Sequence, residues 1–181
     1  MKRLIILMGM PGAGKDTQAL LLEEAADLTV IRVGDEVRKR AKLNKKLDKQ
    51  IDSGALAEDS IVEAIVKEKL IESATNAHLL SDGYPRSLDQ AKALGMMCSA
   101  LNVVIEKVVY IEIPEDEVYK RLEKRGREDD EPEVIRQRLA IFQAETKPVL
   151  SYYESEGLLV RVNGIGSVEE VQNNINKALH S

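Results

Sequence analysis

Near its N-terminus the chain carries GMPGAGKDTQ, Gly9 to Gln18, in which three glycines precede a lysine. An apolar run, RLIILMG, leads into this stretch, and a helical pattern begins near Lys15. Glycine adopts backbone angles closed to other residues, so successive N–H groups can turn toward one anion. The positive end of the following helix and the lysine ammonium would add to the attraction. The stretch predicts a phosphate-binding loop; the alternative is a tight strand-to-helix turn with a surface lysine.

Asp16 follows this lysine, where phosphate-binding loops usually carry a serine or threonine whose hydroxyl binds Mg²⁺. Two interpretations stay open. The carboxylate could lie in the first turn of the helix, stabilised by the helix dipole and facing solvent or a nearby cation. It could instead bind Mg²⁺ or its water shell, since it replaces the metal-binding hydroxyl. Asp82, at the end of the apolar run AHLLSDG, is a metal candidate that would act through water; the alternative is an aspartate in a turn.

Further polar side chains follow the same run, in LLSDGYPRSLDQ. Pro85 stiffens the loop that presents Arg86. Gln90 lies one helical turn beyond that arginine, and its amide offers both a donor and an acceptor. Gln90 is therefore a candidate for reading the edge of a nucleotide base.

A second set of arginines lies in EDEVYKRLEKRGREDDEPEVIRQRL. Arg121 and Arg125 are four residues apart and share one helix face, Arg127 follows the turn, and Arg138 lies on the next helix. A solvated charged face is the ordinary explanation of such a run. Carboxylates in the connection GREDDEPE could instead orient the guanidinium groups in a closed state.

The elements that must position these residues alternate in type. Five short apolar runs, rich in β-branched residues, are separated by longer helical patterns; the runs are RLIILMG, LTVIRVG, AHLLSDG, KVVYIEI and LLVRVN. Near-continuous apolar runs are typical of strands buried on both faces of a parallel sheet. The first, third and fourth are the most apolar, and we expect them at the centre. The helical patterns cover residues 15–26, 59–74, 87–101, 132–154 and 168–179, with the stripe of the second formed by Ile61, Ala64, Ile65 and Leu70.

This alternation predicts a three-layer α/β fold with a doubly wound parallel sheet. Two charged stretches interrupt it, Gly34 to Asp59, with two short helical patterns, and Gly126 to Glu133. Both are expected to be excursions from the carboxyl ends of strands, where open α/β sheets bind ligands.

Composition narrows the class of protein. The 181 residues carry a net charge of −5, which argues against broad binding to nucleic acid or membrane surfaces. The single cysteine, Cys98, excludes an intramolecular disulfide and a zinc site built on several thiolates. The N-terminal apolar run is too short for a secretory signal or a membrane span. We expect a cytoplasmic protein.

Taken in order, the segments GMPGAGKDTQA, VGDEVR, SGALAEDSIV, DGYPRSLDQA, RLEKRGREDDEPEVIRQRL and ETKPVLSYYESEGLLVRVNG resemble the signatures of the adenylate kinase family over nearly the whole chain. The resemblance implies a P-loop kinase fold with a five-stranded parallel sheet, forming one domain over residues 1–181. It implies a small helical excursion at residues 33–60 that binds the nucleoside monophosphate. It also implies a short lid at residues 126–133 without structural zinc.

The resemblance further implies Mg²⁺-dependent in-line phosphoryl transfer, ATP + AMP = 2 ADP, by a monomer whose partners are these nucleotides. Catalysis would rest on Lys15, Arg86, Arg125, Arg127 and Arg138. ATP would bind Gly12, Ala13, Gly14, Lys15, Asp16, Thr17, Arg121, Arg125 and Gly166. AMP would bind Val33, Arg38, Ala55, Leu56, Ala57, Gly83, Tyr84, Pro85, Arg86, Gln90, Arg127 and Arg138. Asp82 would hold Mg²⁺ through water, and Asp16 is the second metal candidate.

Val33 departs from the family pattern, which has threonine there for AMP and alanine for pyrimidine monophosphates. Valine keeps the volume of threonine but loses its hydroxyl, so a UMP or CMP kinase is the alternative, while Gln90 favours adenine. Two other classes are a nucleotide-binding module without transfer chemistry and a P-loop kinase for a small metabolite. Neither explains why the chain has one arginine set beside Gln90 and another around the charged connection.

Overall fold

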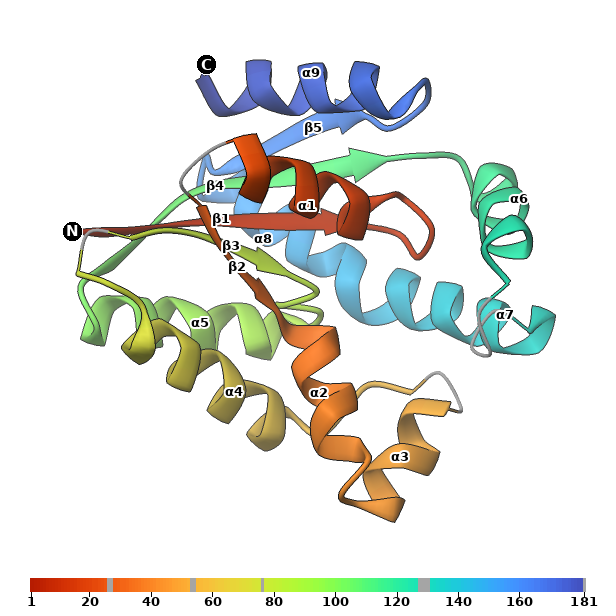
Figure 1. Ribbon diagram of the computed structural model, residues 1–181, viewed down its shortest axis with the longest axis horizontal. Coiled ribbons are helices and arrows are strands. Elements are labelled where there is room, and N and C mark those ends of the chain that lie inside the picture. The colour runs from red at the N-terminus through yellow and green to blue at the C-terminus, as the bar shows by residue number, and fades with distance from the viewer. Residues whose placement is uncertain (26–27, 53–54, 76, 127–130, 181) are drawn as a thin grey trace.

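The computed structural model describes residues 1–25, 28–52, 55–75, 77–126 and 131–180. Within them, five strands form one sheet in which each neighbouring pair is parallel. The strands are β1 (Lys2–Gly9), β2 (Leu28–Arg32), β3 (His78–Asp82), β4 (Val103–Glu112) and β5 (Leu159–Asn163). Their order is β2-β3-β1-β4-β5 (Figure 1). The predicted parallel sheet is confirmed, with the three most apolar runs at its centre.

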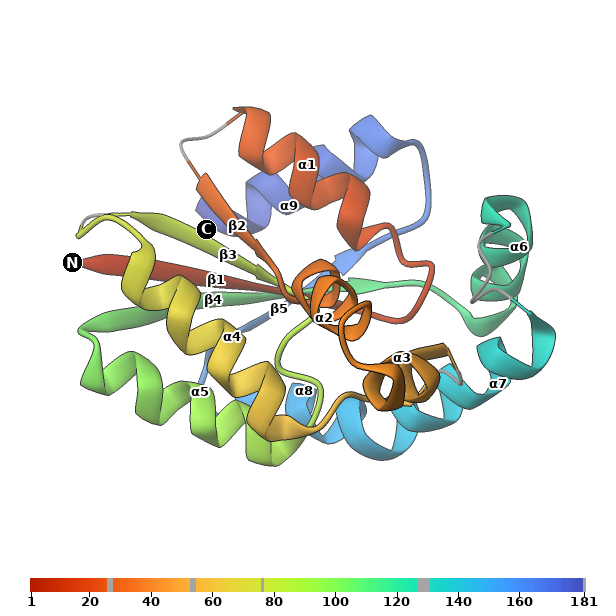
Figure 2. The ribbon, with the colours of Figure 1, turned by 60° about the horizontal axis from the view of Figure 1, so that its bottom comes forward.

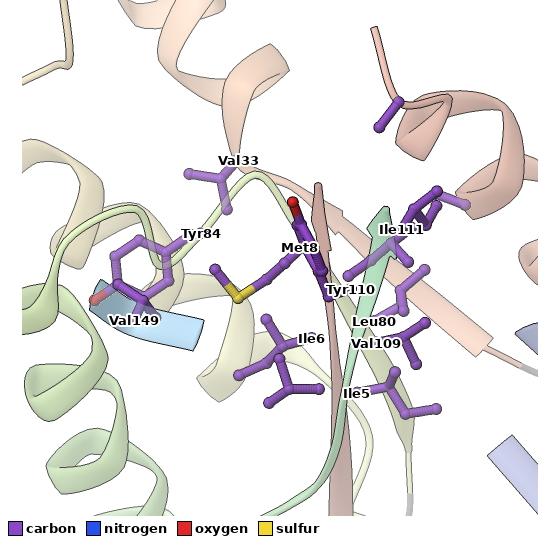
Figure 3. Packing of buried hydrophobic residues seen from close by; sticks show 14 of the residues in the cluster. Ile5, Ile6, Met8, Val33, Leu80, Tyr84, Val109, Tyr110, Ile111 and Val149 are labelled. Carbon is purple, nitrogen blue, oxygen red and sulfur yellow. The ribbon is translucent and has the colours of Figure 1, made fainter. Parts of the chain in front are cut away.

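Helices cover both faces of this sheet (Figure 2). One face carries α1 (Lys15–Ala25) and α9 (Val168–His180), and the other carries α4 (Asp59–Glu72), α5 (Leu88–Ala100) and α8 (Lys147–Ser155). The central strands form the core: Ile6, Val109 and Ile111 are fully buried, and Figure 3 shows Ile6 on one face of the sheet and Val109 and Ile111 on the other. The predicted three-layer α/β fold is therefore confirmed. No helix of the described ranges combines the length and apolar character needed to cross a membrane.

Two predicted boundaries are wrong. Val33 and Gly34, placed at the end of a strand, begin α2 (Val33–Ala41), because Asp35 and Glu36 suit the first turn of a helix. β4 begins at Val103 rather than Lys107. The apolar pattern missed this part of the strand because Lys107 is polar; its side chain donates a hydrogen bond to the Ala178 carbonyl.

The predicted stripe of α4 is also partly wrong. Ala64 is exposed and Ile61 only partly buried. The fully packed residues are Val62, Ile65, Val66 and Leu70. Both stripes fit helical spacing, and contact with the core, rather than periodicity, decides between them.

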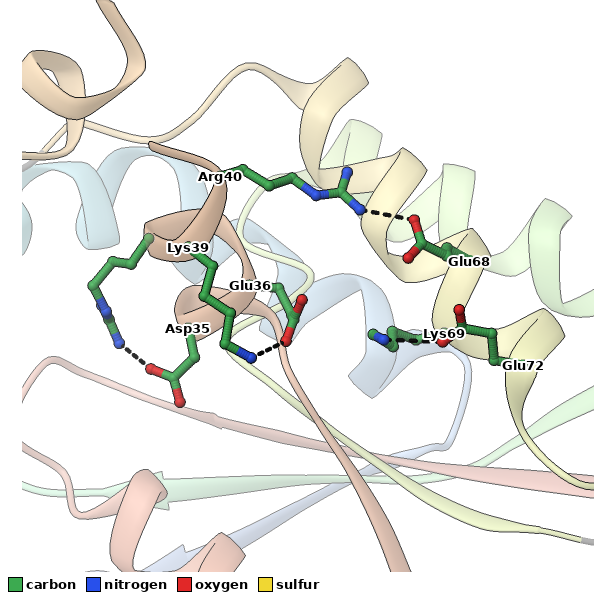
Figure 4. Close-up of polar contacts among 8 residues, drawn as sticks. Asp35, Glu36, Lys39, Arg40, Glu68, Lys69 and Glu72 are labelled. Carbon is green, nitrogen blue, oxygen red and sulfur yellow. Dashed lines mark hydrogen bonds and ion pairs between the residues drawn. The ribbon is translucent and has the colours of Figure 1, made fainter. Parts of the chain in front are cut away.

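Helix α2 and the following α3 (Lys45–Asp52) form the first predicted excursion, beyond the carboxyl end of β2. Figure 4 shows ion pairs within α2, between Lys39 and Glu36 among others, and one between Arg40 of α2 and Glu68 of α4, at 2.8 Å. These side chains are substantially exposed, so each pair contributes little to stability. The Arg40–Glu68 pair nevertheless joins the excursion to the body of the protein.

A long helical rod completes the fold. The stretch predicted as one helix from Pro132 is α7 (Pro132–Ile141), a π-helical turn (Phe142–Thr146) and α8, in direct succession. Pro148 is the physical reason for the turn, because proline lacks an N–H and its ring clashes with the carbonyl four residues back. The wider turn absorbs this defect, and the Lys147 N–H bonds the Phe142 carbonyl five residues back. On the other side of the connection, α6 (Glu115–Arg125) ends at Gly126, whose φ of 63° is left-handed.

Two buried tyrosines give a matched test of the core. Tyr84 and Tyr153 are each 1% exposed. The Tyr84 hydroxyl donates to the Gln90 carbonyl at 3.0 Å, whereas the Tyr153 hydroxyl has no hydrogen-bond partner within the described residues. Tyr84→Phe should lower the free energy of unfolding by about 1 kcal/mol, and Tyr153→Phe should leave it unchanged or raise it. Urea titrations of both variants check this; equal losses would contradict it.

Candidate active site

The candidate site lies at the carboxyl ends of the strands. From β1 the chain runs to β2 at one edge of the sheet, and after β3 it crosses β1 to reach β4. Such a reversal of direction opens a crevice at the strand ends. The crevice here is a cavity lined by the glycine loop, the loop after β3, α2 and the rod; four of its residues are the cations Lys15, Arg38, Arg86 and Arg138.

The glycine loop joins β1 directly to α1. Gly12 and Gly14 have φ values of 76° and 92°, which L side chains rarely adopt. Gln18 makes a helical hydrogen bond to the Gly14 carbonyl, so the first-turn amides of α1 point toward the loop. The Lys15 ammonium donates to the carbonyls of Gly9 and Met10, at 2.9 and 3.0 Å. The lysine thus lies across the loop, at the cavity, as a phosphate-binding loop requires.

Charge around the lysine is unusual. Burial, followed by repulsion from Arg86 and Arg138 and opposed by attraction to Asp82 and Asp16, lowers the pKa of Lys15 to about 8. Burial also raises the pKa of Asp82, against the attraction of Lys15, and the negative charge of Asp16 raises it further. Asp16 is exposed and lies in the first turn of α1, the position given by the first interpretation. Its charge is nevertheless close enough to affect the pKa values of Lys15 and Asp82.

The loop after β3 holds Arg86 in place. The Arg86 N–H donates to Gln90 Oε1 at 2.7 Å, and its Nε donates to the Gly83 carbonyl at 2.8 Å. Arg86 is exposed at the open cavity, and the protein atoms around its guanidinium, followed by the like charge of Arg138, lower the pKa of Arg86. Arg38 reaches the same cavity from α2 and pairs with Asp35 at 2.6 Å.

A second cavity adjoins the first and is lined by several residues that were predicted to bind the acceptor. Its mostly apolar lining comes from α2, the residues before α4, and Gln90 of α5; among the predicted residues it includes Val33, Ala55, Leu56 and Ala57. Both cavities share six lining residues, Arg38, Ile51, Ala55, Leu56, Gly83 and Arg86. A nucleotide could place its base in one cavity and its phosphate in the other.

Gln90, which lines the second cavity, and Tyr84, which lines the first, also have structural roles. Gln90 is 2% exposed, and its Nε2 donates to Asp59 Oδ1 at 2.6 Å while its Oε1 accepts from Arg86. The amide keeps one further donor and one further acceptor position. Its role in base recognition stays a prediction. The ring of Tyr84 packs in the core, and the Tyr84–Pro85 peptide bond is cis.

The predicted donor-base residues meet on the other side of the loop. Arg121 donates to the Gly164 carbonyl at 2.9 Å and to Glu117 at 2.8 Å, which brings α6 to the turn after β5. Gly166 lies in that turn with φ of 126°. Arg125 is in the last turn of α6. Arg127 lies outside the described residues, as does half of the predicted lid, residues 127–130.

Sequence reasoning missed Thr146. This buried residue of the π-helical turn donates from Oγ1 to the Arg86 carbonyl at 2.8 Å. The available signal was Pro148, because a proline inside a helical pattern warns of an irregular turn nearby. Asp59, the partner of Gln90, was interpreted only as the start of a helix.

A glycine loop and a cluster of cations at the strand ends of a β2-β3-β1-β4-β5 sheet define a P-loop kinase fold. The family model described as Adenylate kinase matches residues 7–158. An adenylate kinase of Leptospira biflexa is 37% identical over 187 residues, covering 99% of this chain and 100% of the relative. One of Thermobifida fusca is 37% identical (98% of each chain), and one of Prochlorococcus marinus 39% identical (99% of this chain, 98% of the relative). The chain belongs to the adenylate kinase family and is a phosphotransferase.

The lowered pKa of Lys15 predicts proton uptake when a nucleotide binds. Phosphates favour the charged lysine, so binding raises its pKa, and at pH values near and above 8 the protein takes a proton from solution. Affinity for ATP should therefore fall as the pH rises through about 8. Calorimetric titration with ATP in buffers of different ionisation enthalpy measures the uptake. Lys15→Arg stays charged throughout this range and should show none; equal uptake by both proteins would rule out Lys15 as its source.

Proposed function

We propose that the protein transfers the terminal phosphoryl group of ATP to AMP, giving two ADP. The observation that carries this proposal is the convergence of Lys15, Arg38, Arg86 and Arg138 on one cavity that adjoins a mostly apolar pocket. A protein that only binds one nucleotide would have no use for the arginines that flank both cavities. The family membership supports the same activity.

Phosphoryl transfer between two nucleotides depends on positioning and charge compensation more than on covalent chemistry. An oxygen of the AMP phosphate attacks the γ-phosphorus of ATP while the bond from that phosphorus to the β–γ bridging oxygen breaks, and ADP leaves. The attacking oxygen is already ionised, so no general base is needed.

The chain's cations have distinct places in this reaction. The loop from Gly12 to Thr17 would bind the phosphates of ATP, with Lys15 as the main charge. Arg38 and Arg86 would hold the phosphate of AMP. Arg138 faces both Lys15 and Arg86, so it is placed to stabilise the phosphoryl group in transit.

The donor nucleotide and the moving parts complete the proposal. Arg121 would pack on the base of ATP beside the backbone of Gly166, and Arg125 would reach its phosphates. Arg127 would join Arg138 at the transferring group. We assign residues 33–60 to acceptor binding and residues 126–133 to the lid, whose closure would exclude water that competes with AMP.

The site suits Mg²⁺ delivered with ATP. Asp82 and Asp16 both face Lys15, and carboxylate oxygens are the donors that Mg²⁺ prefers. Within the described ranges no three acidic, histidine or cysteine side chains could hold a metal by themselves, which fits an ion that arrives bound to a nucleotide. When bound, the ion would neutralise phosphate charge. Asp82 would hold it through water.

AMP is the proposed acceptor, in a cytoplasmic monomer. Val33, the position that raised UMP or CMP as an alternative, is 2% exposed and lines the base pocket as a purely apolar contact. The relatives named above are all adenylate kinases, and this favours AMP.

An assay of ADP formation with ATP, Mg²⁺ and each of AMP, UMP, CMP or GMP tests the proposal. AMP should be the best acceptor. Arg86→Ala should reduce turnover at least about a hundredfold without unfolding the protein, because an acceptor phosphate contact is lost. Arg136→Ala, an exposed arginine of α7 paired with Glu133, is the matched control and should be near normal. A preference for UMP or CMP, or near-normal turnover of Arg86→Ala, would overturn the assignment.

Asp16 is proposed as a residue that also acts on the metal, since its charge reaches Lys15, Asp82 and Arg86. Asp16→Asn should raise the Mg²⁺ concentration for half-maximal rate about fivefold, the effect of one charge pair about 4 Å apart in water. Asp89→Asn is the matched control, since Asp89 lies exposed in the first turn of α5. An unchanged Mg²⁺ requirement in Asp16→Asn would contradict a role in metal binding, and Asp16 would then only stabilise the first turn of α1.

A further inference from the structure

One hydrogen bond joins the acceptor loop, which is the loop after β3 that presents Arg86, to the long helical rod. Thr146 Oγ1 donates to the main-chain carbonyl of Arg86 at 2.8 Å, between residues 60 positions apart in the chain. Thr146 is 7% exposed, so water competes little for this bond. The bond therefore fixes the position of the loop relative to the rod.

The π-helical turn presents Thr146 to the loop. Pro148 forces the helix to widen just before α8, and the turn from Phe142 to Thr146 results. The first residue of the turn is anchored as well: the ring of Phe142 stacks on that of Tyr110 in β4, with centroids 6.3 Å apart. The turn is thus held to the sheet at one end and to the acceptor loop at the other.

The same rod carries Arg138 in the last turn of α7. Arg138 and Arg86 line one cavity, and each is close enough for their like charges to repel. Before any phosphate binds, that repulsion favours separation of the rod from the loop. Other bonds of Arg86, to Gln90 and to the Gly83 carbonyl, hold it within its own loop and toward α5. The Thr146 bond instead ties it to the element that bears Arg138.

We infer that Thr146 is a positioning residue for phosphoryl transfer, which fixes the acceptor-side Arg86 at the distance from Arg138 that a transferring phosphoryl group requires. The inference rests on the proposed function. Thr146 itself need not touch a nucleotide; it acts through the Arg86 backbone. Displacement of a catalytic group by about 1 Å can cost about a hundredfold in rate, so one hydrogen bond at this place has a large effect.

Thr146→Val and Thr146→Ser test this role. Valine keeps the shape without the hydroxyl, and serine keeps the hydroxyl. Thr146→Val should lower kcat about tenfold or more, with smaller changes in the KM values for ATP and AMP, and Thr146→Ser should restore most of the loss. Thr146→Ala provides the same comparison if valine prevents folding. Thermal unfolding of each variant shows whether the fold is retained.

Two controls separate positioning from general stability. Ser73→Ala removes a similar bond, from Ser73 Oγ to the Leu70 carbonyl at 2.8 Å. This bond lies at the C-terminal end of α4, so its loss should lower the free energy of unfolding without changing kcat. In a double-mutant cycle, Thr146→Val should cost several-fold less in kcat when Arg138→Lys is already present, because the two changes impair one geometry.

A kcat within about twofold of wild type for Thr146→Val, additive effects in the cycle, or equal losses in the valine and serine variants would overturn the inference. Each of these three outcomes can be measured only if the wild-type protein is active. Wild-type protein that forms no ADP from ATP and AMP would overturn the proposed function instead.

Discussion

Mutual repulsion among four cationic side chains is the constraint that the surrounding structure has to meet. Lys15, Arg38, Arg86 and Arg138 come from four separate parts of the chain and line one cavity. Their charges oppose one another, and in the protein without ligand this repulsion adds to burial, the larger cause, in lowering the pKa values of Lys15 and Arg86. Polyanionic nucleotides offset the repulsion when they bind. The fold stabilises the arrangement meanwhile, because Lys15, Arg38 and Arg86 are each bonded to a main-chain carbonyl or a carboxylate.

The sheet supplies the rigid part of that arrangement. Two largely buried central strands, β1 and β3, end at the glycine loop and at Asp82, so the two segments proposed to surround the phosphates start from fixed points. Elements outside the sheet bring the remaining cations. Arg38 stands on the α2–α3 excursion, which exposed ion pairs such as Arg40–Glu68 link to α4. Weak, exposed links of this kind would permit the excursion to move if it encloses a substrate as proposed.

Much of this could be predicted from residue patterns. The glycine spacing, the apolar runs and the alternation of elements predicted the sheet and its central strands, because parallel strands buried on both faces leave a strong signal. Positions that depend on tertiary contact could not be predicted in this way. The stripe of α4 shifted from Ala64 to Val62 and Val66, since two registers fit the same helical period. The apolar pattern also missed the first half of β4, because Lys107 is polar. Its ammonium can lie in the strand since it donates a hydrogen bond to the Ala178 carbonyl.

Within the site, residue types predicted which side chains gather but not what holds them. Lys15, Arg86 and Arg138 meet as expected, whereas the bond from Thr146 joins positions that no local pattern connects. Gln90 illustrates the opposite case. Its amide suggested recognition of a base, and the structure shows that it also braces Arg86 and Asp59. One side chain can serve both purposes because an amide has more hydrogen-bonding positions than these two bonds use.

The wall shared by the phosphate cavity and the base pocket has a thermodynamic consequence. Arg38, Leu56 and Arg86 belong to both spaces, so an acceptor nucleotide that spans the two cavities would order part of the surface that the donor phosphates meet. The two binding equilibria are then linked, and the linkage is reciprocal: whatever factor one nucleotide imposes on the affinity of the second, the second imposes on the first. Cooperativity between unlike substrates would arise here from common lining residues, without any signal carried over a distance.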